Sequence, residues 1–520
     1  MKNHKFRFLS GLIKTVSAVT IVSITSKILG LLREMGIASY FGVGVKTDAF
    51  YVALIIPALL FTSIGTAIQN LFMIEFTAVK NDQDKTKENR LASNVSNILL
   101  VVSSLVFIIS FIFTPAIIKV IAPGFVDPEK FNLTVKLTRI LLPTMIILPV
   151  YQIRASILRV NNKFVTVAII DLGFNIFQIL YLLLFADKFG IEGLVYSVLF
   201  AYLFQLIVIE LVAYRIGFRN KVVLDFNDRH WKTILKLFFP TFISFGIIQI
   251  NATVDKIIAS NLGDGAISAL NYGFMIRNVL YTVIISTILL VIYPILLKHK
   301  NNNDVKSYNA VGKNTFHTLW AIALPITIIL MLFSESIVRI LFERGEFSTE
   351  ATLLTSGVLF YYAIGIAFYA LKEFLVHICF SQKNTKLPLV VTTIGAVLNI
   401  IFSVILKQWM GVNGIALGLA IAEIISVCVI IIYTQKLGYL NLFKAKKDTI
   451  IIFVINIIIG GLLFITLPHI TLPSNKLMEL VYLIIIGLSV LVIYVLSLIV
   501  GRVSFIRDFI HTIRSGEDAN

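Results

Sequence analysis

The amino-acid sequence predicts an all-α polytopic membrane protein with about 14 transmembrane helices. Twelve of these helices are expected to form two pseudo-repeated six-helix lobes around a central cavity, with two further helices at the C-terminal end. Three observations lead to this prediction: an apolar composition, a succession of long apolar segments, and two short motifs that recur at the same spacing.

The composition is too apolar for a water-soluble fold. Of the 520 residues, 58% are hydrophobic and 14% are charged, and the mean hydropathy is +0.92. Soluble globular domains carry roughly 25% charged residues, and no core could hide this excess of apolar surface. These values exclude a soluble enzyme, a disordered chain and a secreted disulfide scaffold. The two cysteines, Cys379 and Cys428, show no metal-ligand spacing.

Fourteen apolar segments have about the 20 residues needed to cross a bilayer. They are 14–36, 48–75, 94–121, 134–158, 165–187, 191–214, 234–261, 266–297, 311–342, 351–380, 387–406, 411–435, 449–467 and 478–500. Their apolar runs are continuous rather than alternating, which argues against a β-barrel. The first segment lacks a small-residue cleavage site, so we expect a retained helix rather than a signal peptide.

The basic residues alternate between successive loops. The formal net charge is +17. The two termini and the loops after even-numbered segments together hold about 28 Lys and Arg residues, whereas the other loops hold about six. Cytoplasmic loops of membrane proteins are enriched in Lys and Arg, so both termini are expected in the cytoplasm. This distribution accounts for the positive charge, and nucleic acid is not an expected partner.

Two motifs recur at a constant offset of 221 residues. The pattern Ala-Ser-x-x-Gly-x-Gly at 38–44 returns at 259–265, and Gly-x-x-Gly at 190–193 returns at 411–414. Parallel repeats of this kind are a transporter design with the substrate site between the lobes. The expected division is 1–216 for the N-lobe with helices 1–6, 217–436 for the C-lobe with helices 7–12, 437–500 for helices 13 and 14, and 501–520 for a cytoplasmic tail.

The first helix of each lobe carries polar residues along one face. The first segment has Ser23, Ser26, Lys27, Gly30 and Glu34, with Arg33 beside them, and the seventh has Ser244, Asn251 and Asp255, with Lys256 adjoining. A charge at the bilayer centre costs at least about 2.5–3.5 kcal/mol, so such residues face a cavity or a partner. Two interpretations stay open: ion pairs such as Lys27–Glu34 or Arg33–Asp48 that lock helices together, and a hydrated central cavity, which the presence of a polar face in both lobes favours.

The basic members of this set suit an anionic substrate. They are Lys27, Arg33, Lys256 and Arg277. Several Lys or Arg donors are what phosphate groups require, so these residues could hold a diphosphate head while a lipid tail stays in the bilayer. Asp255 and Asn399 are candidate ion ligands for energy coupling. No Walker motif is present, so direct ATP use is not expected, and neither a metal, a cofactor nor a catalytic residue is predicted.

Several segments carry a resemblance to a known family. They are Gly30-Leu31-Leu32-Arg33-Glu34, Phe41-Gly42-x-Gly44, Thr47-Asp48-Ala49-Phe50, Ala122-Pro123-Gly124-Phe125, Ile157-Leu158-x-x-x-Asn162-Lys163-Phe164, Leu341-Phe342-Glu343-Arg344-Gly345-Glu346-Phe347 and Thr385-Lys386-Leu387-Pro388. In this order, from about residue 20 to 436, they are similar to the MurJ/MviN lipid II flippases.

The resemblance implies the fold of the multidrug/oligosaccharidyl-lipid/polysaccharide exporter superfamily, with fourteen helices and a V-shaped central cavity. It implies that lipid II, the undecaprenyl-diphosphate-linked peptidoglycan precursor, is moved by alternating access from the cytoplasmic to the outer leaflet of the bacterial cytoplasmic (inner) membrane. By position, Arg33 and Glu34 match the family's functional Arg–acid pair, and Asp48 matches its functional aspartate. Helices 13 and 14 would form a groove for the polyprenyl tail. Expected partners are the polyprenyl-diphosphate-linked glycan, membrane lipids and cell-wall synthesis proteins.

The chain departs from the family at three basic positions. Lys27 stands where many members have Arg, Phe61-Thr62 stands where many have an Arg, and Arg277 is displaced by two positions. These departures leave open a flippase for another polyprenyl-linked oligosaccharide, such as O-antigen, capsule or another surface polysaccharide. A drug/cation antiporter would prefer an acidic cavity. A membrane glycosyltransferase would need acid/base groups at a reacting centre, often with a metal.

Overall fold

The computed structural model describes residues 2–58, 63–440, 446–469, 473, 475–501 and 503, and these residues contain helices and no strand. Every segment predicted to cross the membrane is helical over most of its described residues, so the all-α membrane protein is confirmed. Ten helices in the described part are long and apolar enough to span a bilayer. The number of fourteen crossings stays a prediction.

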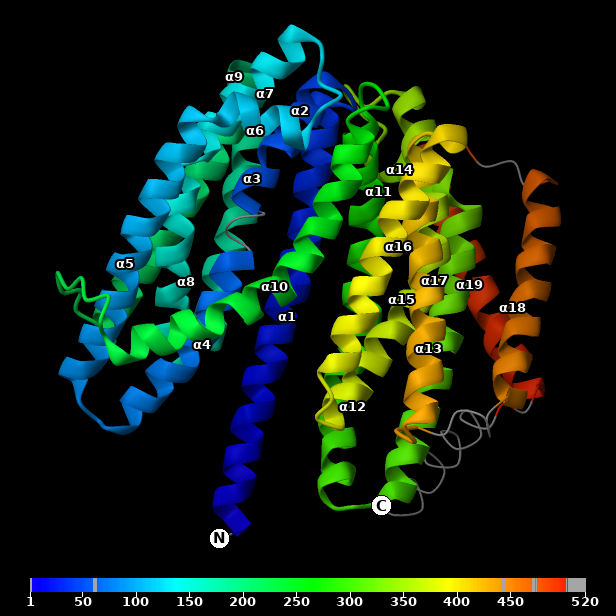
Figure 1. Ribbon diagram of the computed structural model, residues 1–520. Helices are drawn as coiled ribbons and strands as arrows, with labels where there is room; N and C mark the ends of the chain where they lie inside the picture. Colours follow the sequence, from blue (N-terminus) through cyan, green and yellow to red (C-terminus); the bar gives the residue numbers. More distant parts are fainter. Residues whose placement is uncertain are drawn as a thin grey trace. The chain divides into compact units, whose positions relative to one another are not determined.

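The helices form two compact units. Figure 1 labels the helices and colours them along the sequence. Unit 1 comprises Met1–Asn271 and Arg344–Ser348, and unit 2 comprises Tyr272–Glu343 and Thr349–Asn520. Unit 1 contains α1 (Lys2–Phe41), α2 (Val45–Ala53), α3 (Ile55–Pro57), α4 (Ser63–Asn81), α5 (Lys85–Ile112), α6 (Thr114–Ile121), α7 (Pro128–Leu141), α8 (Thr144–Val160), α9 (Phe164–Arg215), α10 (Arg229–Ala259) and the first residues of α11 (Ala266–Leu280).

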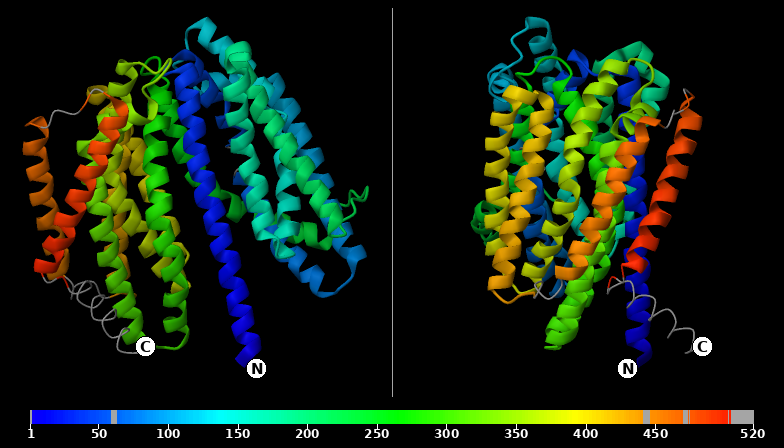
Figure 2. Two further views of the ribbon diagram at one scale, coloured as in Figure 1. Left: turned by 180° about the vertical axis from the view of Figure 1, so that it is seen from behind. Right: turned by 90° about the vertical axis from the view of Figure 1, so that its right-hand side faces the viewer.

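Unit 2 holds the remaining helices, and Figure 2 shows its last two, α18 and α19, side by side. Its elements are the rest of α11, the π-helix η2 (Tyr281–Ser286), α12 (Thr287–Asn301), α13 (Val305–Leu332), α14 (Ser334–Phe342), α15 (Thr349–Ser381), α16 (Lys386–Met410), α17 (Val412–Lys436), α18 (Lys446–Thr466), η4 (Leu467–His469) and α19 (Lys476–Val500). A core of buried apolar residues from α13, α15 and α17 holds this unit together.

Several predicted single helices are divided in the structure. The segment predicted at 134–158 is α7 followed by α8, and the division falls at Leu142-Pro143. The segment predicted at 94–121 divides at Phe113, just before Thr114-Pro115. Proline lacks a backbone N–H and its ring clashes with the preceding turn, so it is favoured in the first turn of a helix and tends to break or kink a helix elsewhere. Prolines therefore set these divisions, which hydropathy alone does not reveal.

Both Gly-x-x-Gly motifs form the same sharp reversal between two helices. Gly190 interrupts α9 with φ +55° and ψ −150°, and Gly411 lies between α16 and α17 with φ +55° and ψ −132°. Only glycine adopts this backbone region without strain. The second glycine of each motif lets the helical segments before and after the reversal pack closely. A Cβ at Gly193 would lie 2.2 Å from the Tyr181 hydroxyl, and one at Gly414 would lie 2.4 Å from the Leu406 carbonyl oxygen. The shared geometry is what an internal repeat requires.

The other repeated motif forms two reciprocal loop contacts within unit 1. A Cβ at Gly124 would lie 2.1 Å from the carbonyl oxygen of Ser260, and one at Gly345 would lie 2.2 Å from that of Ser39. The Gly124 N–H also donates to the Ser260 hydroxyl at 3.2 Å. Ser39 and Ser260 are repeat counterparts, and so are Gly124 and Gly345. Each repeat thus places a loop glycine on the first helix of the other repeat, and this contact leaves no room for a side chain.

The predicted lobe boundaries are not tested by this division into units. Helix α10, which the sequence places in the C-lobe, packs against α4 and belongs to unit 1. The predicted cytoplasmic tail lies outside the described residues, except for Gly501 and Val503. The division at 216/217 and 436/437 therefore stays a prediction.

Substituting Gly411 by alanine should destabilise the folded protein. A Cβ is strained at this φ and ψ, at a cost of about 1–3 kcal/mol. Gly461, on α18, is the matched control because a Cβ there would meet no atom within 4 Å. Thermal unfolding in detergent should show a lower midpoint for Gly411→Ala than for Gly461→Ala. Equal midpoints would contradict the strained reversal.

Candidate functional site

Arg33 on α1 is the centre of a polar cluster inside unit 1. Its guanidinium donates to the Glu34 carboxylate at 2.6 Å and to the Asn175 side-chain oxygen at 3.1 Å. The guanidinium carbon lies 5.6 Å from the centroid of the Phe174 ring. The Asn175 amide in turn donates to the Ser26 carbonyl oxygen at 3.2 Å. The two helices α1 and α9 therefore hold Arg33 in one orientation within the membrane-spanning region.

Glu34 is buried and is held by groups from two further elements. The Tyr51 hydroxyl on α2 donates to its carboxylate at 2.5 Å, and the Asn271 amide on α11 donates at 3.4 Å. The side chain of Glu34 is 6% exposed, whereas that of Arg33 is 20% exposed. The Arg33 Nε–H is buried and has no acceptor among the described residues. Arg33 therefore keeps exposed surface for an anionic ligand, while its buried Nε–H is unsatisfied within the described part of the protein.

The two predicted lysines of unit 1 are placed differently. The Lys256 ammonium on α10 lies 5.9 Å from the centroid of the Tyr51 ring, so it adds positive charge beside the Arg33–Glu34 pair. Lys27 is partly exposed, two turns before Glu34 on α1. Within the described part of the chain it makes no hydrogen bond or ion pair. The structure thus brings Arg33, Glu34 and Lys256 together around Tyr51.

Asp48 is enclosed in a second cluster of unit 1. Its carboxylate has no exposed surface and lies 3.0 Å from the Lys130 ammonium of α7. It also accepts hydrogen bonds from the backbone N–H groups of Gly265 and Ser268, at 2.8 and 2.9 Å, at the start of α11. The Ser268 hydroxyl donates to the same carboxylate at 2.6 Å. A carboxylate at this position stabilises the positive end of a helix dipole.

This arrangement uses the accepting capacity of Asp48 for contacts within the protein. Equivalent residues of the two repeats are also in contact here: the hydroxyls of Thr47 and its counterpart Ser268 are 2.9 Å apart. The Lys130 ammonium reaches a second acid, Asp264, at 2.7 Å, and packs 4.2 Å from the Phe125 ring centroid. Any contact between Asp48 and a substrate would have to replace these bonds, and the predicted substrate role stays a prediction.

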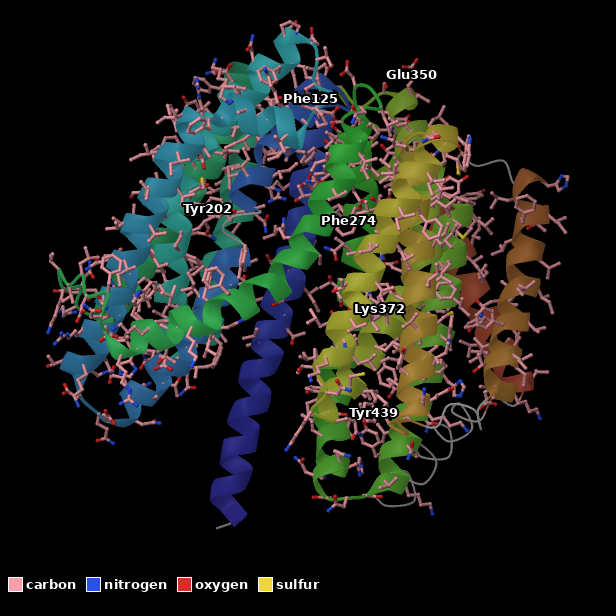
Figure 3. All side chains as sticks on the ribbon, in the orientation of Figure 1. Phe125, Tyr202, Phe274, Glu350, Lys372 and Tyr439 are labelled. Carbon is pink, nitrogen blue, oxygen red and sulfur yellow. The ribbon has the colours of Figure 1, made fainter. Side chains whose placement is uncertain are left out.

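Arg277 is paired inside unit 2. Its guanidinium lies 2.5 Å from the Glu423 carboxylate of α17, and both side chains are 6% exposed. Three aromatic rings surround it at 5.2–5.9 Å from their centroids: Phe274, Tyr362 and Tyr369. Phe274, on α11, is labelled in Figure 3. The second oxygen of Glu423 has no hydrogen-bond donor among the described residues. An anion could contact Arg277 only by competing with Glu423.

The predicted ion ligands are both buried. Asp255 on α10 is 8% exposed, and Asn399 on α16 is fully buried and accepts a hydrogen bond from Ser403 at 3.3 Å. The side chains of Ser244 and Asn251 and the residues Phe61 and Thr62 lie outside the described residues. No group of three His, Cys, Asp or Glu side chains that could hold a metal occurs in the described part.

Four partners of the predicted residues were not singled out as site residues by sequence reasoning. They are Tyr51, Lys130, Asn175 and Glu423. The Lys130–Asp48 contact depends on how α7 packs against α2. Glu423 lies in a long apolar segment, where an acid is itself a signal of a buried partner.

The sequence matches the model of a family described as lipid II flippase MurJ over residues 37–492. A protein of Rhizobium tropici named "Probable lipid II flippase MurJ" is 28% identical over 467 residues, which cover 87% of this chain and 86% of the relative. The protein of the same name from Aquifex aeolicus (strain VF5) is 30% identical over 371 residues, which cover 70% of this chain and 71% of the relative.

Solved structures show the same similarity. The structure titled "Lipid II flippase MurJ, inward closed conformation" matches with a TM-score of 0.80 and 26% identity, over 95% of this chain and 99% of that chain. An inward-facing multidrug resistance MATE family transporter matches with a TM-score of 0.68 and 13% identity, over 81% and 97%. At that identity the second match shows the fold alone.

The two acids around Lys130 provide a matched test of the buried cluster. Removing a buried partner of an ion pair costs about 3–5 kcal/mol, so Asp48→Ala should destabilise the protein strongly. The Asp264 side chain is 62% exposed, and exposed pairs contribute at most about 1 kcal/mol, so Asp264→Asn should change little. Thermal unfolding in detergent measures both variants. A small effect of Asp48→Ala would mean that the cluster does not stabilise the fold.

Proposed function

The chain belongs to the lipid II flippase MurJ family, and we propose that it moves lipid II from the cytoplasmic to the outer leaflet of the bacterial cytoplasmic membrane for peptidoglycan synthesis. The observation that carries the proposal is the match of residues 37–492 to this family, together with the solved flippase structure aligned over 95% of the chain. As a member of a transporter family, the protein is assigned no bond-making step.

We propose that Arg33 contacts the diphosphate of the substrate. The partly exposed Arg33 side chain supports this role, because arginine offers several donors to phosphate oxygens. Lys256 would add charge to the same contact, and Lys27 would meet the anion as it enters. Glu34 and Asp48 would act by holding these elements in place. Arg277 would bind the diphosphate only after release from Glu423.

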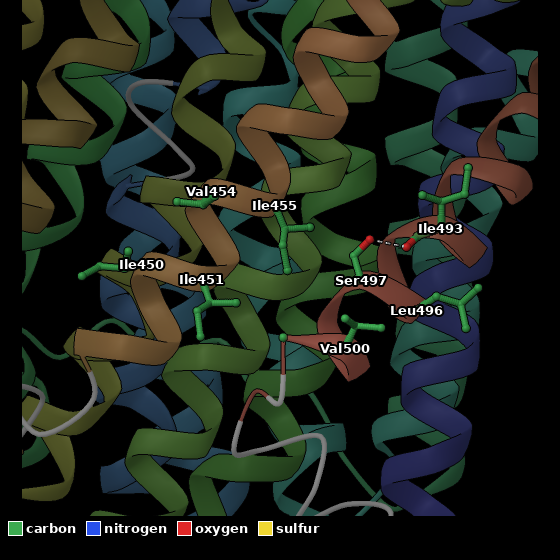
Figure 4. Close-up of a pocket in the computed structure, with 9 residues that line it drawn as sticks. Ile450, Ile451, Val454, Ile455, Ile493, Leu496, Ser497 and Val500 are labelled. Atoms are coloured by element: carbon green, nitrogen blue, oxygen red, sulfur yellow. Dashed lines mark hydrogen bonds between the residues drawn. The ribbon is translucent and has the colours of Figure 1, made fainter.

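We propose that the polyprenyl tail lies against the last two helices. A cavity of about 520 Å³ opens between α18 and α19 and is shown in Figure 4. Its lining consists of Ile450, Ile451, Val454, Ile455, Ile493, Leu496, Ser497, Val500 and Gly501. The Ser497 hydroxyl donates to the Ile493 carbonyl oxygen of its own helix at 2.8 Å, so this polar group is satisfied and the surface suits an isoprenoid chain.

Alternating access is the proposed mechanism, in which the bound headgroup becomes accessible from one side of the membrane at a time. The proposed lobes for this movement are 1–216 and 217–436. The positive charges of the inner loops support cytoplasmic termini. Membrane lipids and cell-wall synthesis proteins are the proposed partners beside the substrate.

Replacing Arg33 by alanine should abolish complementation of a strain depleted of its own lipid II flippase. The variant removes the guanidinium that contacts the diphosphate, whereas Arg33→Lys keeps a charge and should retain partial function. Arg219→Ala is a suitable control because this arginine is exposed and packs on the Tyr214 ring. Membrane levels of each variant are measured by immunoblot. Full complementation by a stably expressed Arg33→Ala protein would contradict the role of Arg33.

A further inference from the structure

A second acidic group lies in the membrane-spanning part of unit 1, outside the site described above. Asp171 is on α9, seven residues after the helix begins at Phe164, which places it about 10 Å along the helix axis. The Tyr151 hydroxyl of α8 donates a hydrogen bond to its carboxylate. No Lys, Arg or His side chain of the described residues lies within 4.0 Å of that carboxylate.

Hydrogen bonds position Asp171 and the backbone around it, but no cation of the described residues forms an ion pair with its carboxylate. The Gln205 amide, on the part of α9 that follows Gly190, donates to the backbone carbonyl oxygens of Ile170 at 3.1 Å and of Asp171 at 3.4 Å. The titratable and charged groups that interact with the carboxylate are Tyr151 and Arg159 of α8 and Tyr202 of α9. Arg159 acts from beyond ion-pair distance. A carboxylate in this position is expected to serve a function, because ionisable groups in membrane helices are costly.

A row of polar side chains connects Asp171 to Arg33. Asp171, Asn175 and Gln178 follow each other at helical spacing on α9, and Asn175 accepts a hydrogen bond from Arg33. Tyr202, labelled in Figure 3, interacts electrostatically with both Asp171 and Arg33. Asp171 therefore lies one helical turn before Asn175, the residue of α9 that accepts the hydrogen bond of the Arg33 guanidinium.

Two donors in this row have no acceptor. Gln178 is 1% exposed, and its Nε2 group has no hydrogen-bond acceptor among the described residues; the same holds for the buried Arg33 Nε–H. Buried polar groups without protein partners are commonly satisfied by ordered water. Ordered water at these two donors would lie beside Asn175, one helical turn from Asp171.

We propose that Asp171 is a proton-binding site and that proton binding there strengthens the binding of an anionic headgroup at Arg33. The step is the addition of one proton to the Asp171 carboxylate; the resulting carboxylic acid keeps its hydrogen bond with the Tyr151 hydroxyl. Protonation removes a negative charge that competes with the diphosphate for the field of Arg33. Because coupling between two sites is reciprocal, the bound headgroup also makes Asp171 easier to protonate.

The coupling rests on the proposed function, whereas the proton site stands on the geometry alone. At an effective dielectric constant of about 20, a unit charge acting over about 10 Å, the length of two helical turns, changes the affinity for an anion about tenfold. We therefore expect the affinity of the wild-type protein for undecaprenyl diphosphate to fall about tenfold as the pH rises through the titration of Asp171.

The binding experiment uses the full chain in lipid nanodiscs with undecaprenyl diphosphate as the probe, between pH 5 and 8. Asp171→Asn keeps the shape and the acceptor for Tyr151 and should bind tightly at every pH. Asp171→Glu should keep the pH dependence. Asp187→Asn, an exposed acid on the same helix, is the matched control and should behave like the wild type. Equal pH dependence in the wild type and Asp171→Asn would overturn the coupling.

Infrared difference spectroscopy tests the proton site without any substrate. Carboxyl carbonyl absorption should grow as the pH falls in the wild type and in Asp187→Asn, and the component that belongs to Asp171 should be missing in Asp171→Asn. Identical spectra for the wild type and Asp171→Asn would overturn the proton site. If undecaprenyl diphosphate fails to bind at every pH while the Asp171 band is present, the proposed function fails and the proton site is supported.

Discussion

Charged side chains among apolar helices need partners close at hand, and this constraint shapes both units. An unpaired charge in a low-dielectric environment costs several kcal/mol, so removing one partner of a buried pair destabilises the folded protein by a similar amount. Among the described residues, examples are Arg33 with Glu34, Lys130 with Asp48 and Arg277 with Glu423. These pairs differ in exposure: the Arg33 side chain is 20% exposed, whereas both members of the other two pairs are enclosed.

The internal repeat explains why small residues occur where they do. Gly190 and Gly411 reverse the chain with one backbone geometry, and Gly124 and Gly345 each touch a carbonyl oxygen of the opposite repeat. Each of these positions excludes a side chain for a geometric reason. The motifs that carry the family resemblance around residues 122–125 and 341–347 thus have a structural purpose, which is to seat these loops on the first helices of the repeats.

The sequence was sufficient for the fold class, because apolar length, loop charge and spaced glycines are visible in one dimension. The family followed from the resemblance of ordered motifs such as those at 30–34 and 341–347. It also singled out Arg33, Glu34 and Lys256, which the structure brings together, and their role in binding stays a prediction. It did not identify Lys130 or Glu423 as partners, because these contacts join helices far apart in the chain. The predicted cavity with four basic residues stays a prediction; within unit 2 the structure encloses Arg277 with Glu423. The divisions at Pro143 and before Pro115 were readable from proline chemistry, but hydropathy segments ignore it.

The most direct test of the account is a leaflet-sidedness assay with purified protein in proteoliposomes, run with lipid II and, in parallel, with another polyprenyl-linked glycan. The account predicts that lipid II becomes accessible on the opposite leaflet only in vesicles that contain the protein, and faster than the other glycan. Lipid II that stays on its original leaflet, or a preference for the other glycan, would contradict it.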